Sequence, residues 1–390
     1  MKSLILLPVF LCVALAFGIG QPPTQHPMRF TNGNQADGKV LEKRDIQFDT
    51  DATILSVGRN KRSAAWRINL WDYGDWMYNG VIQVGNPPVS IMVLIDTGSG
   101  GTWVNGAGCQ PSCRDQPFYD PKKSSTARNN SKGWYQAYGG GYVNGYEVRD
   151  TITIGGVGQP NIPIENFTVG VITNTTFGGS TYAGILGLEI SDWNPIQEAI
   201  RRGYFNNPII SIFFRRFPNS RNATGGSITF GQVETDYCKP VIGWYPITSW
   251  RWQLGVSKIA VGSWSNTTTV SALLDTGTTF IYGPTNQVEQ IQAQFKNKTY
   301  YDGNLWVVPC NNFTGPTLDF TIGGHVYSVQ APNYLIDRYG NGVECMLGIG
   351  KADYGSQFQW VLGTPFLRQF CTSYNYQTQQ IGLAESYWYL

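Results

Sequence analysis

The chain has 390 residues, which is long enough for two folded lobes. It contains 46 glycines and 14% aromatic residues but only 14% charged residues, a balance typical of a β-rich protein with many turns. The formal net charge is only +2, so the composition gives no support for binding of nucleic acid or of an anionic membrane surface.

The N-terminus has the pattern of a secretion signal. Met1-Lys2 is followed by an apolar run from Leu4 to Phe17, and we interpret residues 1–20 as a signal peptide. The alternative is a membrane anchor, but the run is short and Pro8 interrupts it. No later segment approaches the roughly 20 apolar residues that a membrane span needs. We therefore expect a secretory-pathway protein without a membrane span, either secreted or in a lysosomal or other acidic lumen.

Residues 21–62 carry no periodic pattern and end in the basic cluster Arg59-Asn60-Lys61-Arg62. A solvated basic run is the simplest interpretation of such a cluster. In a secretory chain it is also the kind of site that proprotein convertases cut. We predict that residues 21–62 form a propeptide.

The sequence has a strand-like pattern from Tyr78 to Val93. This stretch is followed directly by the motif Leu94-Ile95-Asp96-Thr97-Gly98-Ser99. The same pattern returns 179 residues later. An apolar run predicts a buried strand, and glycine permits the tight turn that places the aspartate at its tip. Each copy consists of Asp, Thr, Gly and a hydroxyl residue: Asp96, Thr97, Gly98, Ser99 and Asp275, Thr276, Gly277, Thr278. One copy could be an ordinary turn. Two copies predict paired carboxylates that share a proton and activate a water.

The repeat extends beyond the aspartates. Tyr182–Leu188 follows the first copy and Trp360–Thr364 follows the second. Gly187 lies 91 residues after Asp96, and Gly363 lies 88 residues after Asp275. This spacing predicts two similar lobes that each contribute one aspartate to a shared cleft.

Between and after the repeats, several shorter elements are expected. Residues 134–142 predict a hairpin with a glycine-rich tip, which could equally be an exposed turn without function. The other expected elements are a helix at 192–202, a strand at 207–217, a helix at 287–295, strands within 313–329 and a last strand at 380–384.

Over residues 65–390 these motifs resemble the pepsin-like aspartic proteases, in particular a nematode-type secreted branch. The resemblance implies an all-β, bilobal acid protease fold with lobes at 63–238 and 239–390, and catalysis by Asp96 and Asp275. It implies that Ser99 and Thr278 hydrogen-bond the outer carboxylate oxygens and that Thr97 and Thr276 cross-brace the two loops. It also places the cut after Arg62 at the distance from Asp96 that the family requires.

The resemblance further assigns the 134–142 hairpin as a flap over the substrate. Trp103 would donate its indole N–H to the oxygen of Tyr138. The residues that it implies in substrate binding are Tyr138, Gly139, Gly140, Trp103, Leu94, Tyr182 and Ile185. Three departures from the family pattern stand out: Gly100-Gly101 replaces a polar pair, the flap tip has three glycines, and Thr364 replaces a further aspartate.

The expected function is hydrolysis of peptide bonds at acid pH by an aspartic endopeptidase, with bulky hydrophobic residues beside the cut. Its partners would be polypeptide substrates and its own propeptide as an inhibitor, with no cofactor or metal, and it would act as a monomer. A Ser/His/Asp enzyme is disfavoured because the only histidine after the propeptide, His325, lies in no nucleophile motif. The alternative is a non-catalytic peptide-binding member of the same fold.

Six cysteines remain after the signal peptide, and six allow 15 pairings. A zinc site is disfavoured, since His26 and His325 lie near no cysteine pair. The resemblance implies three disulfides: Cys109–Cys113, Cys310–Cys345 and Cys238–Cys371, the last typical of the nematode-type branch. Seven Asn-x-Ser/Thr sequons predict a glycoprotein: Asn129, Asn166, Asn174, Asn222, Asn266, Asn297 and Asn312.

Overall fold

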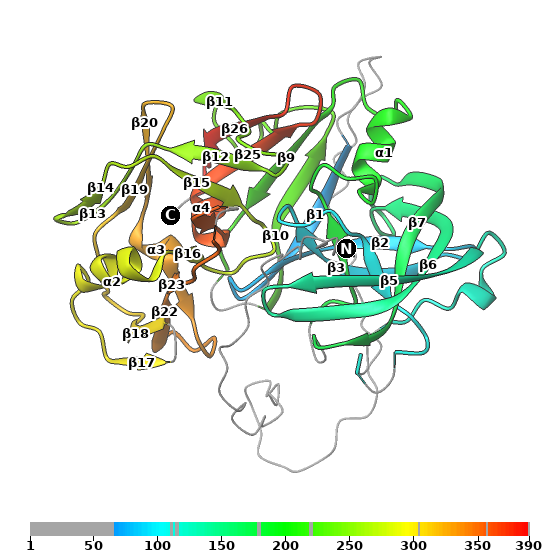
Figure 1. The fold of residues 1–390 in the computed structure, drawn as a ribbon, viewed down its shortest axis with the longest axis horizontal. Helices are drawn as coiled ribbons and strands as arrows, with labels where there is room; N and C mark the ends of the chain where they lie inside the picture. The colour runs from blue at the N-terminus through cyan, green and yellow to red at the C-terminus, as the bar shows by residue number, and fades with distance from the viewer. Residues whose placement is uncertain are drawn as a thin grey trace, which may run out of the picture.

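The structure, a computed structural model, describes residues 66–109, 112–113, 117–177, 181–217, 221–302, 305–355 and 358–388. The expected signal peptide, the expected propeptide and the basic cluster that ends at Arg62 lie outside the described residues, as does the first lobe's expected start at residue 63. Strands dominate and the helices are short, as expected of an all-β protein (Figure 1).

The first half of the chain forms one lobe, drawn in blue to green in Figure 1. One helix, α1 (Pro195–Arg201), and a short 3-10 turn, η1 (Pro121–Lys123), accompany its strands. The strands are β1 (Trp66–Tyr73), β2 (Tyr78–Val84), β3 (Val89–Asp96), β4 (Trp103–Asn105), β5 (Arg128–Tyr138), β6 (Gly141–Ile154), β7 (Ile162–Thr175), β8 (Gly184–Gly187), β9 (Ile209–Phe214) and β10 (Arg221–Phe230).

The second half forms a lobe of smaller sheets. Its helices are α2 (Thr285–Ala293), α3 (Ala331–Tyr334) and α4 (Thr364–Gln369). Its strands are β11 (Gly243–Pro246), β12 (Gln253–Val256), β13 (Lys258–Val261), β14 (Trp264–Asn266), β15 (Val270–Leu274), β16 (Ile281–Gly283), β17 (Tyr300–Asp302), β18 (Leu305–Pro309), β19 (Leu318–Ile322), β20 (His325–Val329), β21 (Leu335–Asp337), β22 (Glu344–Leu347), β23 (Ile349–Lys351), β24 (Trp360–Leu362), β25 (Phe370–Asn375) and β26 (Gln380–Glu385).

One sheet joins the two lobes. The order β11-β26-β25-β9-β10-β1 places the last strands of the chain beside strands of the first lobe, and Figure 1 shows the red β25 and β26 next to the green β9. β25 pairs with β9 antiparallel, with Thr372 opposite Ile212 and Tyr374 opposite Ile210. Because backbone hydrogen bonds cross from one half of the chain to the other, this sheet fixes how the two lobes are placed.

The sequence repeat corresponds to a structural repeat. β3 and β15 each end at an aspartate loop, and each runs parallel to a short buried strand from the downstream segment, β8 and β24 respectively. β8 also pairs antiparallel with β4, and β24 pairs antiparallel with β16 in the same way. The two halves therefore present their aspartates on the same local framework, as the spacing predicts.

Most expected elements are present, with shifted ends. The helix expected from Asp192 begins at Pro195 instead, because the side chain of Asn194 caps it by accepting a hydrogen bond from the Ile196 amide at 2.8 Å. The other expected elements correspond to β9, α2, the β19–β20 hairpin and β26, each within a few residues of its expected range except for the later start of β19.

The three disulfides that the resemblance implies are all present: Cys109–Cys113, Cys238–Cys371 and Cys310–Cys345. The second joins residues 133 apart in sequence and ties the start of the second half to β25 in the shared sheet. Closing so long a loop restricts the unfolded chain strongly.

Candidate active site

Asp96 and Asp275 lie at the ends of buried strands and face each other. Both side chains are buried, with exposed fractions of 5% and 1%. The glycine of each loop packs against the carboxyl of the other: a Cβ on Gly98 would lie 2.4 Å from Asp275 Cγ, and a Cβ on Gly277 would lie 2.6 Å from Asp96 Oδ1. Any larger residue at these glycines would displace the carboxyls, so the motif's glycines permit the close approach of the two acids.

Each carboxylate receives the same pair of hydrogen bonds. The amide of Gly98 donates to Asp96 Oδ1 at 2.9 Å, and the amide of Gly277 donates to Asp275 Oδ1 at 2.8 Å. The hydroxyl of Ser99 donates to Asp96 Oδ2, and that of Thr278 donates to Asp275 Oδ2 at 2.5 Å. The expected hydroxyl bonds to the outer oxygens are thus confirmed. These donors offset part of the cost of burying two carboxyl groups.

The threonines of the two motifs brace the loops across the junction between the lobes. The hydroxyl of Thr97 donates to the carbonyl oxygen of Leu274 at 2.8 Å, and that of Thr276 donates to the carbonyl oxygen of Ile95 at 2.7 Å. Each hydroxyl reaches the strand that carries the other lobe's aspartate. The expected cross-brace is therefore present, and it fixes the two acids relative to each other.

The electrostatics of the pair favour one shared proton. Burial raises the pKa of Asp96. Burial also raises the pKa of Asp275 well above its ordinary value, and the charge of Asp96 raises it further. Two carboxyls this close cannot both ionise easily, so the raised pKa values favour one proton shared by the pair.

The hairpin of β5 and β6 carries Tyr138 at the end of its first strand, with Gly139 and Gly140 forming the turn. The indole N–H of Trp103 donates to the Tyr138 hydroxyl at 2.7 Å, as expected. The edge of the Phe177 ring packs against the Tyr138 ring at a centroid distance of 5.5 Å. These two contacts hold the tyrosine at 4% exposure.

The remaining residues assigned to substrate binding gather in one apolar cluster. Leu94, Tyr182 and Ile185 pack with Trp103 and Tyr138. Leu94 lies opposite Ile185 in the parallel pairing of β3 with β8, two residues before Asp96. The fold thus brings residues from four separate segments together beside the first aspartate.

One departure from the family pattern, Thr364, is structural. The hydroxyl of Thr364 donates to the carbonyl oxygen of Thr279 at 2.8 Å and accepts from Arg368 at 3.1 Å. Thr364 therefore holds the base of the second aspartate loop and supplies no acid.

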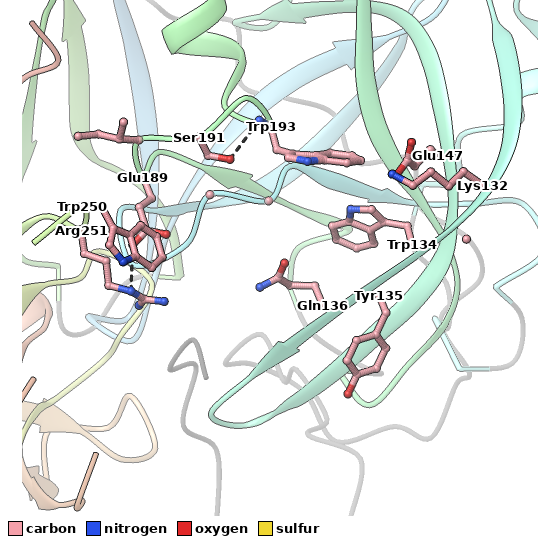
Figure 2. Close-up of a pocket in the computed structure, with 14 residues that line it drawn as sticks. Lys132, Trp134, Tyr135, Gln136, Glu147, Glu189, Ser191, Trp193, Trp250 and Arg251 are labelled. Carbon is pink, nitrogen blue, oxygen red and sulfur yellow. Dashed lines mark hydrogen bonds and ion pairs between the residues drawn. The ribbon is translucent and has the colours of Figure 1, made fainter. Parts of the chain in front are cut away.

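Sequence reasoning missed a buried ion pair beside the first aspartate. Arg251 Nε lies 3.4 Å from Glu189 Oε1, and both side chains are almost fully buried (Figure 2). Glu189 directly follows the Tyr182–Leu188 segment, and Arg251 lies between Trp250 and Trp252. A lone charged residue next to an apolar or aromatic run was the only available signal, because the two residues lie 62 positions apart.

The sequons differ in accessibility. Four asparagines are exposed: Asn166, Asn174, Asn297 and Asn312. Asn266 is half-buried, and its amide donates to Gln287 Oε1 at 3.2 Å. Asn129 and Asn222 lie in strands β5 and β10.

Comparison with known proteins identifies the family. The family model "Eukaryotic aspartyl protease" matches residues 77–386. The chain belongs to the eukaryotic aspartyl protease family. Aspartic protease 6 of Caenorhabditis elegans is 33% identical, over 85% of this chain and 89% of its own length. Aspartic protease 1 of the same organism is 31% identical, over 80% of this chain and 83% of its own length. Gastricsin of Homo sapiens is 27% identical, over 83% of this chain and 88% of its own length.

The protein is therefore an aspartic-type endopeptidase, a hydrolase that acts on peptides, with the bilobal β fold of its family. The family match spans both aspartate motifs and the β5–β6 hairpin. Within the described part of the chain, this aspartyl protease has no helix long and apolar enough to cross a membrane.

Proposed function

We propose that this aspartyl protease hydrolyses peptide bonds at acid pH through a water held between Asp96 and Asp275. The observation that supports this most is the symmetry of the donors. The hydroxyls of Ser99 and Thr278 bind the outer oxygens, and each motif's glycine lies against the opposite carboxyl. This arrangement directs the inner edges of the two acids toward one space between them.

In the proposed reaction, ionised Asp96 accepts a proton from the water, whose oxygen attacks the scissile carbonyl carbon. Protonated Asp275 donates its proton to the carbonyl oxygen, which gives a neutral tetrahedral diol. When the carbon–nitrogen bond breaks, Asp96 passes its proton to the leaving amine and Asp275 regains one from the diol. No covalent intermediate forms, and both acids return to their starting states. The raised pKa values of both acids support one shared proton, and its assignment to Asp275 is part of the proposal.

The substrate's bulky apolar side chain would pack on the cluster of Leu94, Tyr182 and Ile185, beneath Tyr138. The backbone amides of Gly139 and Gly140 at the hairpin turn would bind the substrate's main chain as the flap closes. Because these residues lie beside Asp96, a side chain seated there would place its peptide bond near the acids.

We further propose that the chain is made as a secreted or lysosomal zymogen. Residues 1–20 would direct it to an oxidising lumen, in keeping with its three disulfides. Residues 21–62 would inhibit the enzyme until they are removed, leaving a monomer with lobes at 63–238 and 239–390. The exposed sequons would carry glycans, and the hydrogen-bonded Asn266 is the least suited of the described ones.

The rival function, peptide binding without cleavage, is tested directly. The activated enzyme is incubated with an unfolded protein from pH 3 to pH 7, and new N-termini are identified by mass spectrometry. Cleavage confined to acid pH supports the proposal. An Asp275→Asn variant run in parallel excludes a contaminating protease. Binding of the unfolded protein without new N-termini at any pH would establish the rival.

A further inference from the structure

A pocket of about 390 Å³ opens beside the Asp96 loop, and its wall residue Trp134 also belongs to the apolar cluster that contains Tyr138. Figure 2 shows it between two walls. Trp134, Gln136 and Trp193 lie on one side, and Glu189, Trp250 and Arg251 lie on the other. The pocket touches the first aspartate motif itself, because the amide of Glu189 donates to the carbonyl oxygen of Ser99 at 3.0 Å.

The floor of this pocket is the glycine pair that departs from the family pattern. A Cβ on Gly100 would lie 2.6 Å from Ser191 Cβ. A Cβ on Gly101 would lie 3.2 Å from both Gln136 Oε1 and Trp134 Cζ2. A polar pair at these positions would therefore fill the floor or push the walls apart. The two glycines create the space.

Aromatic rings form most of the pocket's side walls. The indoles of Trp134 and Trp193 lie with centroids 6.0 Å apart, and the Arg251 guanidinium lies 4.7 Å from the centre of the Trp250 ring. The ring faces and edges that line the pocket favour another planar group, through stacked and edge contacts. The walls thus select an aromatic side chain by shape.

At the polar end of the pocket, one buried carboxyl oxygen lacks a hydrogen-bond donor. Glu189 is 3% exposed, and its Oε1 atom receives no hydrogen bond from any residue that the structure describes, although Arg251 Nε lies 3.4 Å away. A buried carboxyl oxygen without a donor is costly, so a ligand that supplies one gains affinity. This is the second observation, besides the cavity, that points to a ligand.

From these observations we propose that the pocket is a substrate side-chain site that selects tyrosine, with Glu189 and Arg251 binding the phenol hydroxyl. The proposal rests on the proposed peptidase function. A cationic side chain would meet the Arg251 guanidinium, and an anionic one would meet the nearby catalytic acid Asp96. A purely apolar one would leave the Glu189 oxygen without a donor. A phenol meets all three conditions.

The protonation of Glu189 is compatible with this selection. Burial raises the pKa of Glu189 to about 8, against the opposing effect of Arg251 and with a smaller contribution from Asp96. A protonated carboxyl can donate to the phenol oxygen and accept from its hydroxyl, and an ionised one can still accept. The phenol hydroxyl can therefore form a hydrogen bond with Glu189 whether that carboxyl is protonated or ionised.

The test uses the activated enzyme and peptides that differ at one residue. A position-scanning library first locates the subsite. Peptides with Tyr, Phe, Gln, Glu or Lys at that position are then compared by kcat/KM. We expect the tyrosine peptide to exceed the phenylalanine peptide by about tenfold or more, as for the loss of one buried hydrogen bond to a charged group.

The double variant Glu189→Leu/Arg251→Met removes the pair without leaving either charge alone. It should still cleave the phenylalanine peptide and should reduce the tyrosine preference to within about twofold. The control Glu198→Leu/Arg202→Met makes the same changes in a 2.7 Å ion pair at the end of α1, where Glu198 also pairs with Arg201, and it should keep the wild-type ratio.

Equal cleavage of the tyrosine and phenylalanine peptides at every subsite would overturn the proposal. So would an unchanged ratio in the double variant, or a glutamate or lysine peptide that is cleaved faster than the tyrosine peptide. If wild type bound the peptides without cutting them, the proposed function would fail separately, and the ratio of the Kd values would decide the selectivity.

Discussion

Thr97 and Thr276 exchange two hydrogen bonds across the junction of the lobes. The Thr97 amide donates to the Thr276 hydroxyl at 2.9 Å, and the Thr276 amide donates to the Thr97 hydroxyl at 3.0 Å. Because each hydroxyl also donates to a carbonyl of the opposite strand, four hydrogen bonds join the two aspartate loops. The relative position of the acids depends on this network.

The Thr97→Val variant keeps the volume of the side chain but leaves the Thr276 amide and the Leu274 carbonyl without their partners. Buried polar groups without partners cost about 1–3 kcal/mol each. We expect the free energy of unfolding, measured by denaturant titration, to fall by about 2–4 kcal/mol and kcat to fall more steeply than KM changes. Thr153→Val, at a half-buried position of β6, is the matched control and should change neither quantity appreciably. Unaltered stability in Thr97→Val would contradict the cross-brace.

Trp103 and Tyr138 form the second testable pair. Trp103→Phe and Tyr138→Phe each remove the 2.7 Å hydrogen bond that positions the Tyr138 side chain. Each change should lower kcat/KM about fivefold, the effect of roughly 1 kcal/mol. The double variant should be no worse than the poorer single variant, because the same bond is lost in all three. Additive losses in this double-mutant cycle would show that the two side chains act independently.

The stability of the enzyme should decline from acid to neutral pH. Burial and the neighbouring charge of Asp75 raise the pKa of Asp72 in β1 to about 8. Between pH ~4, the usual carboxyl value, and pH 8, the folded protein binds a proton there that the unfolded chain does not. Stability contributed by that proton is present in acid and is lost as the pH rises through this window.

Asp72→Asn tests this assignment, since an asparagine amide can donate toward Asp75 as a protonated carboxyl does. Both proteins carry the inactivating Asp96→Asn substitution, which prevents self-digestion. The free energy of unfolding should fall between pH 4 and pH 7 in each, and this fall should be smaller with Asp72→Asn by on the order of 2–4 kcal/mol. An identical pH dependence with and without the Asp72→Asn substitution would mean that another group is responsible.

Activation should follow cleavage after Arg62. This site ends the basic cluster Arg59-Asn60-Lys61-Arg62, outside the described residues. Arg62→Ala should leave a longer and less active form in the secreted material, because the propeptide would stay attached. N-terminal sequencing decides the matter, and a mature N-terminus well before residue 50 would refute this prediction.

More of the candidate site than of the overall fold could be predicted from the sequence. Two Asp-Thr-Gly motifs with matching flanks specify a local strand, turn and donor set, so the roles of Ser99 and Thr278 follow from chain neighbours. The helix start at Pro195 was missed because two capping residues, Asp192 and Asn194, lie within one turn. The pairing of β9 with β25 leaves no periodic signal, since it joins strands about 160 residues apart. The Glu189–Arg251 pair was hidden for the same reason.

The most direct test of the two-aspartate assignment is the kcat for peptide cleavage by Asp96→Asn and Asp275→Asn at the acid optimum. Asparagine keeps the shape and most hydrogen bonds of each aspartate, so both variants should fold, and each should lose about a thousandfold or more in kcat. Asp236→Asn, at an ion pair on the surface, is the matched control and should stay fully active. Near-normal cleavage by either Asp96→Asn or Asp275→Asn would contradict the shared-water mechanism.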